Sequence, residues 1–147
     1  MRLRKLRRLA EISPNDWPLL TQLVFCSLTV GVAVRLVALP RLIACMARCA
    51  ESRWLRCLPL QHGWYDVARL VTLADLAARV THGQGRCLAR SLLLFWLLKA
   101  RGEPAELLIG ISKEAAALYS HAWIELRSKV IGDTPQSIGR FALLLHF

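Results

Sequence analysis

A cysteine, a histidine and an aspartate follow one another in an order that suits thiol chemistry. Cys87 comes after the glycines of "GQGR" and begins an apolar helical stretch, "CLARSLLLFWLLKARG". In the first turn of a helix, unpaired backbone N–H groups and the helix dipole favour a thiolate, and the adjacent Arg86 adds positive charge. The same N–H groups could hold the oxyanion of a tetrahedral intermediate. The pattern therefore predicts that Cys87 is a nucleophile.

A thiolate nucleophile needs a base, and the base needs a group that orients it. In "SHAWIEL" the alternation of a strand places His121, Trp123 and Glu125 on one face. Asp133, in "VIGD", follows on the next strand after a short turn, so we expect it beside His121. Cys87, His121 and Asp133 thus form a candidate Cys-His-Asp triad.

The residue types alone leave a structural alternative open. The same three residues could be a buried thiol, a hydrogen-bonded strand residue and a turn acid. Three further histidines are rival bases, and we expect each at the surface, two in loops and one at the chain end: His62, His82 and His146.

Helices are expected before the candidate site. "SPND" predicts a helix start with Ser13 as N-cap, Pro14 in the first turn and Asp16 as the acid of a capping box. We expect this helix to run from Pro14 to Leu39 and to end at Pro40. Further helices are predicted over 41–58, over 65–80 and from Cys87 to the stop at Gly102, with a loop over 59–66.

The hydrophobic period changes to alternation after Gly102. Strands are predicted over 105–112, 119–126 and 130–133, and "RFALLLHF" is a candidate last strand. Helices followed by a small antiparallel sheet, with the sheet packed on the central Cys87 helix, make an α+β fold. We predict one domain over 1–147, with a helical, basic half over 1–82 and the catalytic helix and sheet over 83–147.

Charge and hydropathy limit the possible partners. The chain is 55% apolar with a net charge of +10, and residues 1–60 hold ten Lys/Arg against three acids. These arginines lie among apolar helix positions without a nucleic-acid-reading motif, which favours contact with an acidic peptide, a partner protein or anionic lipid. Arg35 interrupts the long apolar segment 19–39 at a cost of ~2.5 to 3.5 kcal/mol in a bilayer, so we expect a buried or interfacial helix there.

The other cysteines point to a reducing, cytoplasmic location. The chain has five cysteines without regular spacing. Four lie in apolar helical patterns, where we expect them to fill the core: Cys26, Cys45, Cys49 and Cys57. Cys45 and Cys49 are not followed by a second ligand pair, so no metal site is predicted.

The run "CLARSLLLFWLLKARGEPAELLIGI", followed by "HAWIEL" and then Asp133, resembles the transglutaminase-like cysteine peptidases of lasso peptide biosynthesis. These are the B proteins that remove the leader from the precursor peptide. The similarity covers about residues 68–133. The matching motif residues are Cys87, Leu88, Arg90, Ser91, Arg101, Gly102, Ala105, Leu107, Ile109, Gly110, His121, Ala122, Trp123 and Asp133.

The resemblance implies a transglutaminase-like, papain-like core without a cofactor. Cys87 would attack the scissile carbonyl, His121 would serve as base and then acid, and Asp133 would orient the imidazole. The released core peptide would pass to an asparagine synthetase-like macrolactam cyclase. Since the helices from Ser13 onward leave no room for a fused leader-recognition domain, the chain resembles the split form, which depends on a separate small leader-binding protein.

Other residues and functions stay open at this level. Gln84, Arg86 and Trp123 are candidates for substrate or oxyanion contacts, although the loop position of Gln84 favours a solvated residue over an oxyanion role. A triad of this kind could also pass the acyl group to an amine instead of water. The basic, apolar N-terminal half could instead serve as a scaffold, or bind the inner face of the membrane as a peripheral protein.

Overall fold

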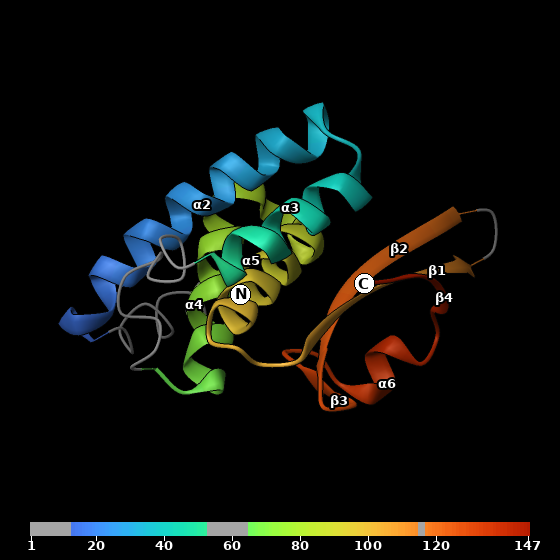
Figure 1. Cartoon of the computed structure of the whole chain (residues 1–147). Helices are drawn as coiled ribbons and strands as arrows, with labels where there is room; N and C mark the ends of the chain where they lie inside the picture. Colours follow the sequence, from blue (N-terminus) through green and yellow to red (C-terminus); the bar gives the residue numbers. More distant parts are fainter. Residues whose placement is uncertain (1–12, 53–64, 115–116) are drawn as a thin grey trace.

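The helices come first and the sheet follows, as the computed structural model of the chain shows for residues 13–52, 65–114 and 117–147 (Figure 1). This order confirms the predicted α+β fold. The elements are η1 (Pro14–Asp16), α2 (Trp17–Leu36), α3 (Leu39–Glu51), α4 (Val67–His82), η3 (Gly83–Gly85), α5 (Cys87–Ala100), β1 (Ala105–Glu114), β2 (Ala117–Leu126), β3 (Lys129–Ile131), α6 (Pro135–Ile138) and β4 (Ala142–His146).

The first helical segment begins as predicted but ends early. Asp16 accepts a hydrogen bond from the Ser13 N–H at 2.8 Å, and the Ser13 side chain caps the first turn, so the capping box is confirmed. However, α2 ends at Leu36, and Pro40 lies in the first turn of α3. The prediction that Pro40 ends the first helix is therefore wrong. A proline has no N–H to donate, which suits the first turn of a helix, where N–H groups lack partners.

The next two helices differ from their predicted bounds at both ends, since α3 already begins at Leu39 and α4 begins and ends two residues later than predicted. α3 ends at Glu51, and the rest of the predicted helix, 53–58, lies outside the described residues. In α4 the Asp66 side chain accepts the Arg69 N–H at 2.7 Å, which fixes the start two residues after Tyr65. The helix then continues past the predicted end at Val80 to His82, and Gly83 terminates it with a φ of 59°.

Two of the three rival histidines, His82 and His146, have partners other than Cys87. His82 is on the last turn of α4 and half-buried, so its predicted loop position is wrong. A Cβ on Gly31 of α2 would lie 2.3 Å from the His82 Nε2, so this glycine makes room for the ring. His146 is on β4, where it pairs with Glu106 at 3.0 Å, and His62 lies outside the described residues.

The sheet has the strand order β3-β2-β1-β4, and all neighbours are antiparallel. β1 and β2 pair along their whole length. Arg127 and Ser128 join β2 to β3 with left-handed φ values of 52° and 62°, as a two-residue hairpin turn requires. β3 is short and pairs with β2 only from Ile124 to Leu126. α6, which the sequence pattern did not predict, begins at the Thr134 cap and leads to β4.

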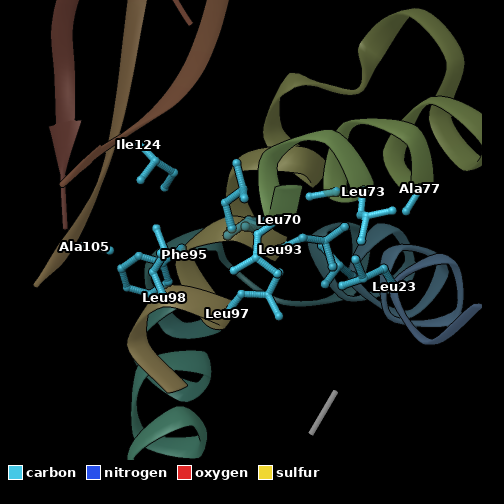
Figure 2. Packing of buried hydrophobic residues seen from close by; sticks show 14 of the residues in the cluster. Leu23, Leu70, Leu73, Ala77, Leu93, Phe95, Leu97, Leu98, Ala105 and Ile124 are labelled. Carbon is cyan, nitrogen blue, oxygen red and sulfur yellow. The ribbon is translucent and has the colours of Figure 1, made fainter. Parts of the chain in front are cut away.

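The core forms around α5, which lies between the other helices and the sheet. Figure 2 shows its side chains meeting α2 and α4 on one side and residues of β1 and β2 on the other. The fully buried side chains of α5 are Leu92, Leu93, Leu94, Phe95, Leu97 and Leu98. Each contributes about 1.5–3 kcal/mol to stability through burial. This packing confirms that the sheet lies against the Cys87 helix.

α2 is apolar on two opposite faces. One face packs into the core through Leu19, Leu23 and Val30. The other face is solvent-exposed and is called here the exposed α2 face: Trp17, Phe25, Leu28, Val32 and Leu36. The segment Pro14–Leu36 is long and apolar enough to cross a membrane by length and composition. Its start is tied to α4, because Asp16 is buried and paired with Arg69.

The cysteines expected in the core divide into two groups. Cys26 and Cys49 are half-buried, whereas Cys45 is exposed, so core filling is wrong for Cys45. The buried face of α3 is formed by Ile43, Met46 and Ala50, and Cys45 lies on the opposite side of the helix. Cys57 lies outside the described residues.

Candidate active site

Cys87 is the first residue of α5 and is half-buried. A hydrogen bond with His121 is the largest influence on its thiol and lowers its pKa, while burial acts in the opposite direction. Backbone hydrogen bonds from Ala122 and Leu88 lower the pKa further. A sulfur with an imidazole and two N–H donors around it is stabilised as a thiolate.

His121 lies between the thiol and Asp133. Its Nε2 is 3.2 Å from the Asp133 Oδ2. The hydrogen bond with Asp133 and then that with Cys87 raise the pKa of His121 from 6.5 to about 9, although burial opposes them. Because Nε2 faces the carboxylate, Nδ1 is the nitrogen left for the thiol. At neutral pH these shifts favour a thiolate beside an imidazolium.

A glycine turn brings Asp133 to the imidazole. β3 ends at Ile131, and Gly132 has a φ of +79°, a conformation that favours glycine. A Cβ on Gly132 would also lie 3.1 Å from the Val71 Cγ1 of α4. The chain therefore leaves the sheet at this point, and Asp133 lies past the end of β3, not within the predicted strand.

Arg90 is a part of this site to which the sequence reasoning gave no role. Its Nη2 pairs with the same Asp133 Oδ2 that faces His121, and its Nη1 lies 3.4 Å from the Gly132 carbonyl. Burial acts to raise the pKa of Asp133, but the His121 hydrogen bond and the Arg90 charge outweigh it and lower the pKa. The available signal was spacing, since Arg90 is three residues after Cys87 and so on the same side of the helix.

Two aromatic rings hold the His121 imidazole. The ring centroid of Phe141 lies 5.3 Å from that of His121, and the Trp123 centroid lies 6.3 Å away. Gly110, which pairs with His121 across the sheet, makes space for both rings. A Cβ there would lie 2.9 Å from the Phe141 Cβ and 3.0 Å from the Trp123 Cη2. Phe141 was not among the predicted site residues because it follows α6, outside the recognised motifs.

The indole of Trp123 has a partner of its own. Its Nε1 donates to the Glu125 carboxylate at 3.1 Å, and the residue is only 4% exposed. This placement favours packing against His121 over the predicted substrate or oxyanion contact.

Arg86 and Gln84 lie just before the nucleophile. The Arg86 Nε is 3.2 Å from the Asp75 carboxylate of α4, and its Nη1 is 3.3 Å from the Gly83 carbonyl. These contacts tie the start of α5 to α4 and favour a positioning role for Arg86. Gln84 lies in the turn η3, and its side chain is outside the part of the chain that the structure describes.

Within the described ranges, no group of three or more His, Cys, Asp or Glu side chains is placed to hold a metal ion.

The geometry agrees with a comparison against known families. The family model of the transglutaminase-like superfamily matches residues 26–146, a segment that includes Cys87, His121 and Asp133. The chain belongs to the transglutaminase-like superfamily. Members of this superfamily commonly have cysteine peptidase or acyltransferase activity. The searches found no match among curated proteins and none among solved structures.

Proposed function

We propose that this transglutaminase-like protein is a cysteine peptidase with Cys87 as nucleophile, His121 as acid and base, and Asp133 as the residue that orients the imidazole. The observation that supports this most strongly is the position of His121. Its ring contacts the thiol at the start of α5 on one side and the Asp133 carboxylate on the other. Both partners raise the pKa of His121, to about 9, so the imidazolium is ready to donate a proton at neutral pH.

The proposed reaction has two halves. The Cys87 thiolate attacks the scissile carbonyl, and a C–S bond forms as the carbonyl oxygen takes the negative charge. The C–N bond then breaks, and the His121 imidazolium gives its proton to the leaving amine. Water next attacks the thioester, with neutral His121 accepting its proton, and the acid product leaves as the thiolate is regenerated.

The first experiment is alkylation of Cys87 by iodoacetamide near neutral pH, read by intact mass. We expect fast labelling of one site that disappears in Cys87→Ala, because the thiolate reacts and the thiol does not. The matched control is Cys26→Ala, which removes a half-buried thiol whose pKa is raised by burial. Slow, equal labelling of several cysteines would contradict the proposal.

We further propose that the substrate is a lasso peptide precursor and that the peptidase removes its leader. The support is the resemblance of the Cys87 helix, the strand entry after Gly102 and the "HAWIEL" strand to the B proteins. The partners proposed with it are a separate leader-binding protein and a macrolactam cyclase that receives the free amine. We place the reaction in the cytoplasm.

A panel of lasso precursor peptides, each mixed with its leader-binding protein, tests this assignment by mass spectrometry. We expect one cut at the leader–core junction, and none with His121→Ala. Cleavage at many positions, or equal cleavage of unrelated peptides, would overturn the substrate assignment but not the peptidase. Incorporation of an added amine at the cut site, in place of water, would identify acyl transfer instead.

We also propose that the exposed α2 face binds the anionic inner surface of the membrane. Its five large apolar side chains lie along one side of the helix, and the exposed Arg35 lies beside them. The segment before Ser13, "MRLRKLRRLAEI", adds five Lys/Arg directly ahead of this helix. An apolar face with flanking cations is the pattern of interfacial helices.

Vesicle co-sedimentation tests the membrane proposal. Vesicles containing phosphatidylserine should bind the chain, neutral phosphatidylcholine vesicles should bind it less, and salt should weaken the difference. Phe25→Ser with Leu28→Ser should reduce binding, whereas Thr29→Ala, on an exposed but polar position of α2, should not. Equal amounts of the chain sedimenting with both vesicle types at all salt concentrations would refute the membrane proposal.

A further inference from the structure

The edge of β2 nearest to Cys87 lacks a neighbouring strand. β3 pairs with β2 from Ile124 to Leu126 and then leaves the sheet through the turn at Gly132. If β3 had continued in register, Gly132 would face Trp123 and Asp133 would form the next hydrogen-bonded pair with Ala122. Instead, two side chains of α5 occupy that place.

The backbone of Ala122 shows which way this edge faces. Its carbonyl accepts a hydrogen bond from the Ser91 Oγ at 2.9 Å, and its N–H donates to the Cys87 sulfur. Both groups therefore point away from β1 and toward the start of α5. The side chains of Cys87 and Ser91 thus form the hydrogen bonds with Ala122 that a residue of β3 would otherwise make.

At every second residue of β2 toward its start, the backbone groups point outward in the same way. Because backbone groups in an antiparallel pair alternate in direction, Ser120 and Leu118 point their N–H and C=O groups outward as Ala122 does. Among the described residues, none forms a hydrogen bond with these outward backbone groups. Leu118, Tyr119 and Ser120 are exposed, and Figure 1 shows this end of the β1–β2 hairpin projecting beyond the helices.

We propose that this edge of β2, from Leu118 to Ser120, binds the peptide substrate as an added strand that leads its scissile bond to Cys87. The inference rests on the proposed peptidase function and adds the mode of recognition. The occupant is an extended peptide segment, because only a strand offers N–H and C=O groups at the spacing of the edge. The outward groups of Ser120 and the Cys87 sulfur lie on the same side of β2, so a strand on this edge runs directly toward the thiolate.

The side chains at the edge add an apolar preference. Leu118 is 69% exposed and Tyr119 is 50% exposed, and they lie on opposite faces of the sheet. Leu118 shares the face of Ala122, which is the face that α5 covers farther along the strand. A substrate residue beside it would gain an apolar contact on the side of the sheet where Cys87 lies.

Two thiol-reactive probes test the inference directly. One is an epoxysuccinate with a dipeptide arm on each side, so that it reads either direction of the bound strand, and the other is epoxysuccinamide without arms. The readout is the second-order rate constant for labelling of Cys87, measured by intact mass. We expect the armed probe to react at least about tenfold faster, the factor that one net backbone hydrogen bond of ~1.4 kcal/mol provides.

Removal of the edge hydrogen bonds should abolish this advantage. Ser120→Pro removes the outward N–H, and proline is tolerated at a strand edge where the N–H faces solvent. On the unchanged protein, methylation of the backbone nitrogens in both arms should have the same effect. His146→Pro is the matched control, because His146 also points its N–H outward, but at the opposite edge of the sheet on β4. The His146→Pro variant should keep the full rate advantage of the armed probe.

The outcomes separate the inference from the function on which it rests. Strand pairing is overturned if the armed probe reacts no faster than the unarmed one, or if its rate advantage survives both Ser120→Pro and N-methylation. In either case, selective labelling of Cys87 still supports the proposed peptidase. Failure of both probes to label Cys87 selectively overturns the proposed function and the strand inference together. Equal unarmed rates in the wild type and Ser120→Pro show that the variant has kept its site.

Discussion

Replacement of Asp133 by asparagine should lower the pKa of His121 and shorten the pH range of activity. The carboxylate hydrogen bond is the largest cause that raises the pKa of His121 from 6.5 to about 9. A hydrogen bond to a charged group contributes about 1.5–3 kcal/mol. One pKa unit corresponds to about 1.4 kcal/mol, so the loss amounts to roughly one to two pH units.

The role of the imidazolium determines the direction in which the pH profile of activity should move. In the wild type His121 stays protonated up to about pH 9, and activity should fall above that pH as the donor of the leaving-group proton is lost. In Asp133→Asn the imidazolium loses its proton at lower pH, so the alkaline limb of the activity profile should move toward neutrality. Removal of the carboxylate should also weaken the thiolate, since Cys87 depends most on its hydrogen bond with His121.

The assay is an NMR titration of the histidine Cε1–H signals, with His121→Gln used to assign the resonance. Glu125→Gln is the matched control, because Glu125 lies on the same strand but pairs with Trp123. It removes one negative charge and should leave the pKa of His121 nearly unchanged. An unshifted pKa in Asp133→Asn, or the same shift in Glu125→Gln, would refute the argument that the specific hydrogen bond sets the titration.

Three further substitutions address the supporting residues. Arg90→Lys should reduce the rate of Cys87 labelling by about tenfold, because a lysine cannot hold the Asp133 carboxylate and the neighbouring carbonyl together; an equal rate in labelling kinetics would contradict this. Gly110→Ala should destabilise the chain by about 1–3 kcal/mol in urea unfolding, because the added methyl contacts Phe141; a stability equal to the wild type would count against that contact. Ser128→Gly should raise the free energy of unfolding by about 1 kcal/mol, since glycine adopts the left-handed φ of 62° without strain, and a lower melting temperature would disprove it.

Local signals were sufficient to predict the elements that carry the site. The capping box at Ser13, the glycines before Cys87 and the alternation around His121 each depend on neighbouring residues, and the structure has a helix start or strand at each. The alternation also placed Ala122 and Ile124 on the strand face opposite His121, and both are buried. Such features follow from neighbouring residues and from the hydrophobic period of each segment.

Features that depend on distant contacts could not be predicted in this way. Pro40 is compatible with the end of one helix or the start of the next, and the packing of α3 against α5 through Ile43 and Met46 determines the outcome. Arg90 was visible as a motif residue, but its role depends on Asp133, which reaches it only because Gly132 turns the chain away from the sheet. The spacing of residues places Arg90 on the same side of α5 as Cys87, but it does not reveal the pairing with Asp133, which depends on the tertiary fold.

The dependence of Cys87 on β2 has a consequence during synthesis of the chain. The groups that lower its thiol pKa come from Leu88 in its own helix and from His121 and Ala122, which leave the ribosome later. A nascent chain that has formed α5 but not β2 therefore has the Leu88 N–H near the sulfur but lacks the His121 and Ala122 hydrogen bonds that lower the thiol pKa further. The full lowering of the thiol pKa therefore requires the sheet to close over the helix, and a chain that lacks β2 should react more slowly at Cys87.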